Sequence, residues 1–206
     1  DEIRTVYSDA YRATFFLSLP LYASVVAVAP LVGELWIGHY ENGFVVYSVL
    51  VAAAYWSNTL VGPAYFVNLG TGALRWNTWS FVVTAVLNAV LGYLLGAIMG
   101  GAGVVWGYVV ATMAGSSLII LGYLRDHHVP LATLLPGESQ RLLLACCLGL
   151  TLGWLAFDVI GAFAGPLVQT TLSSVICLAV IIPVFWIHPL RERIRSLVAL
   201  AFRAQK

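Results

Sequence analysis

The chain of 206 residues is 61% hydrophobic and only 9% charged. Because soluble domains are about 45–50% apolar and about 25% charged, this composition excludes an ordinary soluble domain and predicts a protein embedded in a membrane. The formal net charge of +1 is by itself no argument for or against a nucleic-acid partner. The arginines are placed as membrane-side anchors and not along a phosphate-tracking stripe, so we expect no nucleic-acid partner.

Residues 1–13 begin the chain with a short amphipathic pattern. Apolar side chains recur at helical spacing from Ile3 to Tyr11, which predicts a cytoplasmic surface helix or a connector from earlier spans. The first residue is Asp1 and not Met, and we therefore expect that a larger polypeptide continues upstream.

Six apolar stretches of membrane-spanning length follow within residues 14–187. They are Thr14–Gly33, Phe44–Val67, Thr78–Met99, Ala102–Leu124, Leu142–Phe163 and Pro166–Ile187. A span needs about 20 apolar residues, and the absence of polar–apolar alternation excludes barrel strands. The sequence predicts an all-α fold, a polytopic bundle of six transmembrane helices with short amphipathic helices at both ends.

All ten Lys and Arg residues lie at the chain ends or in alternate loops. They are Arg4, Arg12, Arg75, Arg125, Arg141, Arg191, Arg193, Arg195, Arg203 and Lys206. By the positive-inside rule, both termini and the loops after the second and fourth spans are cytoplasmic. A missed or additional span would have disturbed this partition, so the charges support the count of six.

The second and third spans are joined by "YFVNLGTGALRWN", residues 65–77. Gly70 and Gly72 do not form the glycine pattern of a nucleotide-binding loop, and no strand precedes them. We predict a turn at the cytoplasmic surface, where Arg75 anchors the chain.

The third and fourth spans carry small residues at every fourth position. The positions are Gly92, Gly96 and Gly100, then Gly103, Gly107, Ala111 and Gly115, with Gly101 in the turn between the spans. Glycine in a helix is unfavourable by about 1 kcal/mol relative to alanine, so a stripe of glycines favours close helix packing. We predict a tightly packed hairpin; glycines that act as hinges are the alternative.

Few polar side chains interrupt the spans. Asn58 and Asn88 are expected to be buried amides that hold helices together or face a hydrophilic cavity. Asp158 is the only acidic residue within the predicted spans, and Gln169 lies at a similar depth. They predict either a hydrogen-bonded pair or a proton or cation site coupled to transport.

Other polar groups give weaker indications. Arg12 and Arg75, with Arg125 and Arg141, lie at cytoplasmic span ends; they are anchors that could also attract a pyrophosphate group. The three cysteines, all inside spans, are expected to be small buried residues. Ser117 follows a Gly-x-Ser pattern, but no histidine lies in a span beside it, so we predict no catalytic residue, metal or cofactor.

Residues 188–206 end the chain with another amphipathic pattern. Leu190, Ile194 and Leu197 recur at helical spacing opposite Arg191 and Arg195. This predicts a cytoplasmic interfacial helix that binds anionic lipid; a regulatory or partner-binding tail is the alternative.

One long run resembles a known family. It reads "GPAYFVNLGTGALRWNTWSFVVTAVLNAVLGYLLGAIMGGAGVVWGYVVAT", residues 62–112. The run is similar to the C-terminal half of polysaccharide and oligosaccharide flippases, which belong to the multidrug/oligosaccharidyl-lipid/polysaccharide exporter superfamily. The order and spacing of Gly70, Gly72 and Arg75, then Asn88, then the glycines from Gly100 to Gly107, carry the resemblance, which is good over the first four spans and topological over the last two.

The resemblance implies a transporter built from two bundles around a central cavity. It would move a lipid-linked glycan by alternating access in a prokaryotic plasma membrane, and this chain would be the second bundle, paired with an N-terminal bundle of the same polypeptide. Two alternatives remain: a cation-coupled multidrug exporter of the same superfamily, which Asp158 favours, and a membrane scaffold that does not transport.

Overall fold

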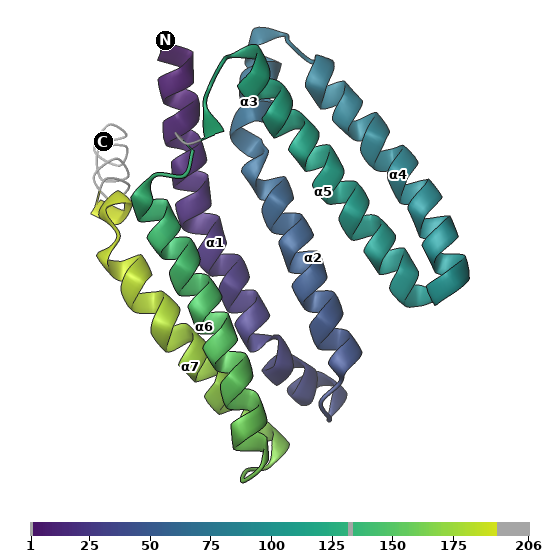
Figure 1. Cartoon of the computed structure of the whole chain (residues 1–206), viewed down its shortest axis with the longest axis vertical. Helices are drawn as coiled ribbons and strands as arrows, with labels where there is room; N and C mark the ends of the chain where they lie inside the picture. The colour runs from purple at the N-terminus through teal and green to yellow at the C-terminus, as the bar shows by residue number, and fades with distance from the viewer. Residues whose placement is uncertain (1, 132–133, 193–206) are drawn as a thin grey trace, which may run out of the picture. The chain divides into compact units, whose positions relative to one another are not determined.

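The computed structural model describes residues 2–131 and 134–192, and the regular structure in that part of the chain is helical (Figure 1). The helices are α1 Glu2–Ile37, α2 Asn42–Leu60, α3 Gly62–Thr71, α4 Arg75–Met99, α5 Gly101–Asp126, α6 Gly137–Gly161 and α7 Pro166–Ile187. Among the described residues, six stretches are long and apolar enough to cross a membrane, with α2 and α3 together forming one of them. The all-α polytopic fold predicted from the sequence is confirmed.

Helix α1 is continuous from the first described residue to Ile37. No break separates residues 1–13 from the first span, although a separate connector was expected there. At 1.5 Å per residue its 36 residues extend about 54 Å, which exceeds the hydrocarbon core of about 30 Å. Because α1 continues past Gly33, it also contains Glu34 near its C-terminal end.

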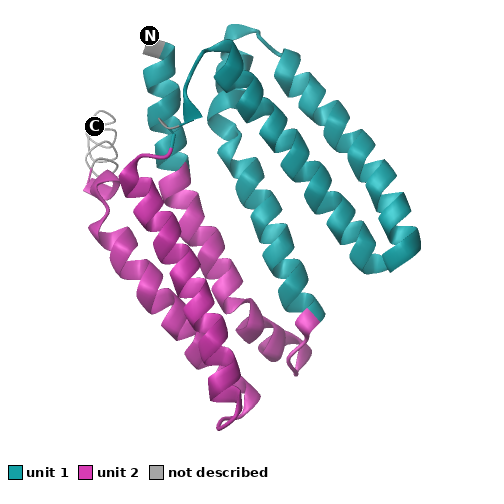
Figure 2. Ribbon diagram, in the orientation of Figure 1, with its two compact units in different colours: residues 1–14, 43–134 teal, residues 15–42, 135–206 magenta. Residues whose placement is uncertain are grey.

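The chain divides into two compact units (Figure 2). Unit 1 contains the described residues of Asp1–Thr14 and Gly43–Leu134, and unit 2 those of Phe15–Asn42 and Leu135–Lys206. The division falls inside α1: its residues up to Thr14 belong to unit 1, where Tyr7 contacts Tyr123 of α5, and the remainder belongs to unit 2 with α6 and α7. Residues 193–206, where most of the predicted C-terminal amphipathic helix falls, lie outside the described residues.

In unit 1, α4 and α5 form a closely packed hairpin (Figure 1). The turn between them contains Gly100 with a φ of +64°, a conformation that side-chain-bearing residues rarely adopt. A Cβ atom at Gly103 would collide with the carbonyl oxygen of Leu95, and one at Gly107 would lie 2.7 Å from the backbone nitrogen of Gly92. Close approach of the two backbones therefore requires glycine on α5.

The other glycines of the stripe differ in how much space surrounds them. A Cβ atom at Gly96 would touch a methyl group of Val104 at 3.0 Å, whereas Gly70, Gly92 and Gly101 have nothing within 4 Å of that position. Gly92 supplies a backbone surface for α5 and needs no empty space of its own. The spacing of small residues predicts the hairpin but does not show which glycines the contact requires.

Unit 2 is built on the α6–α7 hairpin. A Cβ atom at Gly149 would lie 2.9 Å from the carbonyl oxygen of Cys177, so the small residue again admits a neighbouring backbone. The Ser174 hydroxyl donates a hydrogen bond of 2.7 Å to the Ala27 carbonyl of α1. Cys146 and Cys177 are buried, but Cys147 is exposed, so the expectation of three buried thiols is wrong for Cys147.

Candidate functional site

The second span, predicted as one helix over Phe44–Val67, is a single membrane-length stretch that divides into α2 and α3 at Val61, which keeps a right-handed helical conformation (φ −69°, ψ −28°). Helix α2 ends at Leu60 and α3 begins at Gly62. Pro63, at the start of α3, has no N–H and cannot continue the hydrogen bonding of α2. The chain bridges the break with a hydrogen bond of 3.3 Å from the Val61 nitrogen to the Asn58 carbonyl. Helix breaks at membrane depth are tolerated where protein or a polar cavity surrounds them.

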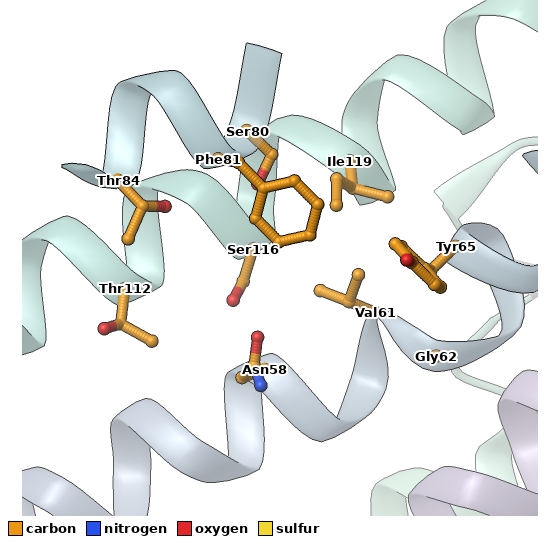
Figure 3. A pocket seen from close by; sticks show the side chains of 10 residues that line it. All are labelled: Asn58, Val61, Gly62, Tyr65, Ser80, Phe81, Thr84, Thr112, Ser116 and Ile119. Atoms are coloured by element: carbon orange, nitrogen blue, oxygen red, sulfur yellow. The ribbon is translucent and has the colours of Figure 1, made fainter. Parts of the chain in front are cut away.

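A pocket of about 310 Å³ lies beside this break, within unit 1 (Figure 3). Residues around the α2–α3 break form one wall, and residues of α4 and α5 form the other. The lining residues are Asn58, Val61, Gly62, Tyr65, Ser80, Phe81, Thr84, Thr112, Ser116 and Ile119. Six of these ten residues carry uncharged polar side chains and none carries a charge, so the pocket offers hydrogen bonds without an ionic anchor.

Two polar groups face each other across the pocket. In Figure 3 the carboxamide of Asn58 points toward the hydroxyl of Ser116. Ser116 is only 3% exposed, and among the described residues its hydroxyl has no hydrogen-bond partner. Buried polar atoms almost always have a partner, so this hydroxyl is the pocket group most in need of one, and a small rearrangement would let it bind a ligand or a water molecule.

The remaining hydroxyls are positioned by the α4–α5 contact. The Ser80 hydroxyl donates a hydrogen bond of 2.8 Å to the Gly115 carbonyl. A Cβ atom at Gly115 would collide with the Thr84 hydroxyl, so glycine at this position leaves room for the Thr84 side chain. The same small-residue packing that forms the hairpin thus places two hydroxyls on the pocket wall.

Aromatic rings form the end of the pocket near the break. The rings of Tyr65 and Phe81 are 6.2 Å apart between centroids and meet edge to face at 74°. Both residues line the pocket, one from α3 and one from α4. A small cluster of uncharged donors and acceptors next to aromatic surface is suited to a hydroxyl-rich ligand that has apolar ring faces.

Of the predicted site residues, Asn58 lines the pocket and Asn88 does not. Both residues are exposed, so the expected burial is wrong for both, although a polar cavity was one of the two placements expected for Asn58. Asn88 lies on α4, where no residue of the most apolar stretch, all of it described, is buried. Burial of a polar residue within a span depends on the neighbouring helices, and α4 packs chiefly on α5.

The two predicted cytoplasmic arginines occupy different places. Arg75 is exposed, and its guanidinium lies 4.9 Å from the centroid of the Trp76 ring. Arg12 lines a second, shallower pocket with Arg4 and His128. The structure therefore places neither arginine at the polar pocket beside the helix break.

Asp158 and Gln169 both belong to unit 2 but are not joined by the predicted hydrogen bond in the part of the chain that is described. The Gln169 side-chain nitrogen instead donates a hydrogen bond of 2.8 Å to the Phe157 carbonyl. Gly161 leaves space for the Gln169 carboxamide. Asp158 is exposed and faces Tyr40, whose pKa is raised by burial and then by the Asp158 carboxylate.

An asparagine pair that the sequence analysis did not identify closes the α3–α4 turn. The Asn68 side chain donates a hydrogen bond of 2.9 Å to the Asn77 side-chain oxygen, and Asn77 donates one of 3.2 Å to the Tyr65 carbonyl. Asn68 is 2% and Asn77 3% exposed. Gly72, with a φ of +75°, makes the turn between the two asparagines. An asparagine on each side of a Gly-containing turn was the feature of the sequence that could have indicated this pair.

Within the described ranges, no group of three or more His, Cys, Asp or Glu side chains could hold a metal ion. Comparisons with known protein families, with curated proteins and with solved structures find no match to this chain.

Proposed function

We propose that this chain is part of a membrane transporter that moves lipid-linked oligosaccharide or polysaccharide precursors across the bilayer. The observation that carries the proposal is the uncharged, hydroxyl-lined pocket beside the broken second span. Sugars present several hydroxyls and apolar ring faces, which match hydrogen-bonding groups placed next to aromatic rings. Its volume of about 310 Å³ is at the low end for small-molecule sites, so only part of a glycan would occupy it at one time.

The interruption of helical hydrogen bonding at Pro63, in the second span, favours a transport function over a protein that only binds its ligand. Transporters commonly place substrate sites at discontinuous membrane helices, and a rocking of helix bundles then exposes the site alternately to each side. In this proposal the termini are cytoplasmic in a prokaryotic plasma membrane, and the glycan passes to the outer leaflet. A second bundle, N-terminal to this one in the same polypeptide, would complete the cavity.

The test compares two neighbouring serines in the native polypeptide, reconstituted in liposomes with a fluorescent lipid-linked glycan. Ser116→Ala removes the unpartnered pocket hydroxyl, and Ser117→Ala removes an exposed hydroxyl one residue away. Loss of one hydrogen bond is worth about 1 kcal/mol, so Ser116→Ala should lower transport at limiting substrate about fivefold. Ser117→Ala should transport at the unaltered rate. If the two single variants and the double variant Ser116→Ala with Asn58→Ala all transport the glycan at the same rate, the proposal is contradicted.

Cation-coupled export of drugs is a second candidate, because the exposed Asp158 carboxylate lies at the end of a membrane-spanning helix. A carboxylate that binds a cation during transport should be essential, so Asp158→Asn should abolish cation-dependent efflux of a drug from vesicles. Ser116→Ala should then have little effect. Efflux that persists in Asp158→Asn would exclude this coupling role.

A further inference from the structure

A second pocket of about 300 Å³ lies in unit 1, with no lining residue in common with the polar pocket and with charged side chains in its lining. It is shallow and open. Arg4, Ser8, Asp9 and Arg12 of α1 line one side, and His128 and Val129 of the segment after α5 line the other. We call these residues the headgroup groove. None of them belongs to the polar pocket beside the helix break.

The sequence of α1 builds one wall of the headgroup groove by helical spacing. Arg4, Ser8 and Arg12 are four residues apart and therefore lie on one face of the helix, with Asp9 beside them. The other wall depends on an unusual turn, because His128 adopts a φ of +50°. That turn allows the Val129 nitrogen to donate a hydrogen bond of 3.0 Å to the Leu124 carbonyl, which holds the segment against the end of α5.

Aromatic stacking fixes the two walls to each other. The rings of Tyr7, on α1, and Tyr123, on α5, are 4.0 Å apart between centroids, and both side chains are 0% exposed. Tyr123 also stacks on His127 at 4.3 Å. Buried aromatic contacts therefore join the two walls at the base of the headgroup groove.

The charges of the headgroup groove are of both signs. Arg4 and Arg12 can pair with phosphate oxygens, because a guanidinium presents a planar set of donors. Asp9 would repel a ligand that carries phosphate alone, but its carboxylate can accept hydrogen bonds from an ammonium group. A ligand with a phosphate and a primary ammonium a few atoms apart matches both signs at once.

We propose that the headgroup groove binds a phospholipid whose phosphate is esterified to a primary amino alcohol, as in phosphatidylethanolamine. Arg4 and Arg12 bind the phosphate, and Asp9 binds the ammonium. The lipid is favoured over a soluble ester as the source of this headgroup because α1 is a membrane-spanning helix. This site is independent of the proposed transport.

The test measures lipid binding to delipidated protein in detergent by native mass spectrometry. The probes are dioctanoyl phosphatidylethanolamine, phosphatidylcholine and phosphatidylglycerol, with soluble glycerophosphoethanolamine as the headgroup without acyl chains. We expect phosphatidylethanolamine to bind about tenfold more tightly than phosphatidylcholine, because three methyl groups remove every ammonium donor. Glycerophosphoethanolamine should bind far more weakly than phosphatidylethanolamine. Equal binding of the two would show that the headgroup groove recognises a soluble ester and not a lipid.

Three variants assign the binding to named residues. Asp9→Asn should remove the preference for phosphatidylethanolamine over phosphatidylcholine without weakening phosphatidylglycerol. Arg12→Gln should weaken all three lipids about tenfold. Arg141→Gln makes the same charge change at an exposed residue outside the headgroup groove and should leave all affinities unaltered. Equal binding of phosphatidylethanolamine and phosphatidylcholine by the unmodified protein, or an unaltered preference in Asp9→Asn, would overturn the proposal.

Discussion

The side chains of Asn68 and Asn77 show how much one polar pair can contribute in an apolar protein. Each asparagine is nearly fully buried, and each hydrogen bond satisfies a group that would otherwise lack a partner in that place. In a membrane protein a buried amide without a partner is unfavourable because water cannot replace the partner. The pair therefore holds the end of α3 against the start of α4. Through the hydrogen bond to the Tyr65 carbonyl, it also positions Tyr65, which lines the polar pocket.

Replacing Asn77 should destabilise the protein through the partners that it leaves behind. Asn77→Ala removes an acceptor from Asn68 and a donor from the Tyr65 carbonyl, and the expected loss is about 1–3 kcal/mol in the free energy of unfolding. The measurement is unfolding in detergent micelles, with Asn88→Ala as the control because Asn88 is exposed on α4. Equal stability of the two variants would show that the pair contributes little.

At the residue scale, the sequence shows which spans contain polar side chains, but it does not show which partner each polar side chain has. It identifies polar groups within spans, but Asn58 and Asn88 look alike in sequence and only Asn58 lines a pocket. Gln169 was paired with Asp158 by depth, whereas the nearest acceptor is the Phe157 backbone. A side chain selects its partner by direction as well as depth, and direction depends on how neighbouring helices rotate against each other.

Among the elements, the α4–α5 hairpin was the most predictable from sequence. Small residues at every fourth position permit close approach of two helices, and the Gly-rich turn joins them. The break between α2 and α3 was less accessible, although Gly62-Pro63 marks it. Proline within an apolar stretch kinks some membrane helices and begins others, and the outcome depends on what surrounds the freed backbone groups.

Glycines of the hairpin should respond very differently to alanine. Gly103→Ala forces a Cβ atom against the Leu95 carbonyl and should lower stability by about 1–3 kcal/mol, as overpacking does. Gly92→Ala meets open space and should be neutral or stabilising by up to about 1 kcal/mol, since alanine favours helix. Unfolding of both variants in the same detergent gives the comparison. A destabilised Gly92→Ala together with an unaffected Gly103→Ala would contradict the described contact.

At the scale of the whole chain, charge and hydropathy together predict six membrane-crossing segments, and the described residues contain six helical stretches long and apolar enough to cross a membrane. The two compact units were not predicted, because a division inside a continuous helix leaves no mark on composition. Neither was the headgroup groove, whose two walls are more than 100 residues apart in sequence.

The distribution of basic residues also makes a prediction about orientation. In a variant whose three cysteines are replaced by serine, Ala162→Cys after α6 should react with a membrane-impermeant maleimide added to intact cells. Ala73→Cys between α3 and α4 should react only after permeabilisation, because the positive-inside rule predicts that the loops with arginine are cytoplasmic. Labelling of Ala73→Cys in intact cells would reverse the proposed orientation.

The sparse packing of α4 has a consequence for how this protein changes during evolution. In a membrane, the outward surface of α4 would face lipid hydrocarbon. Selection on that surface should then act on the hydrophobicity of each side chain and not on its shape. Homologous chains should exchange Val, Leu, Ile and Phe freely along that surface. The α5 face opposite it should remain glycine at Gly103 and Gly107, where any side chain would separate the helices. One hairpin should thus contain the most variable and the least variable positions of the protein.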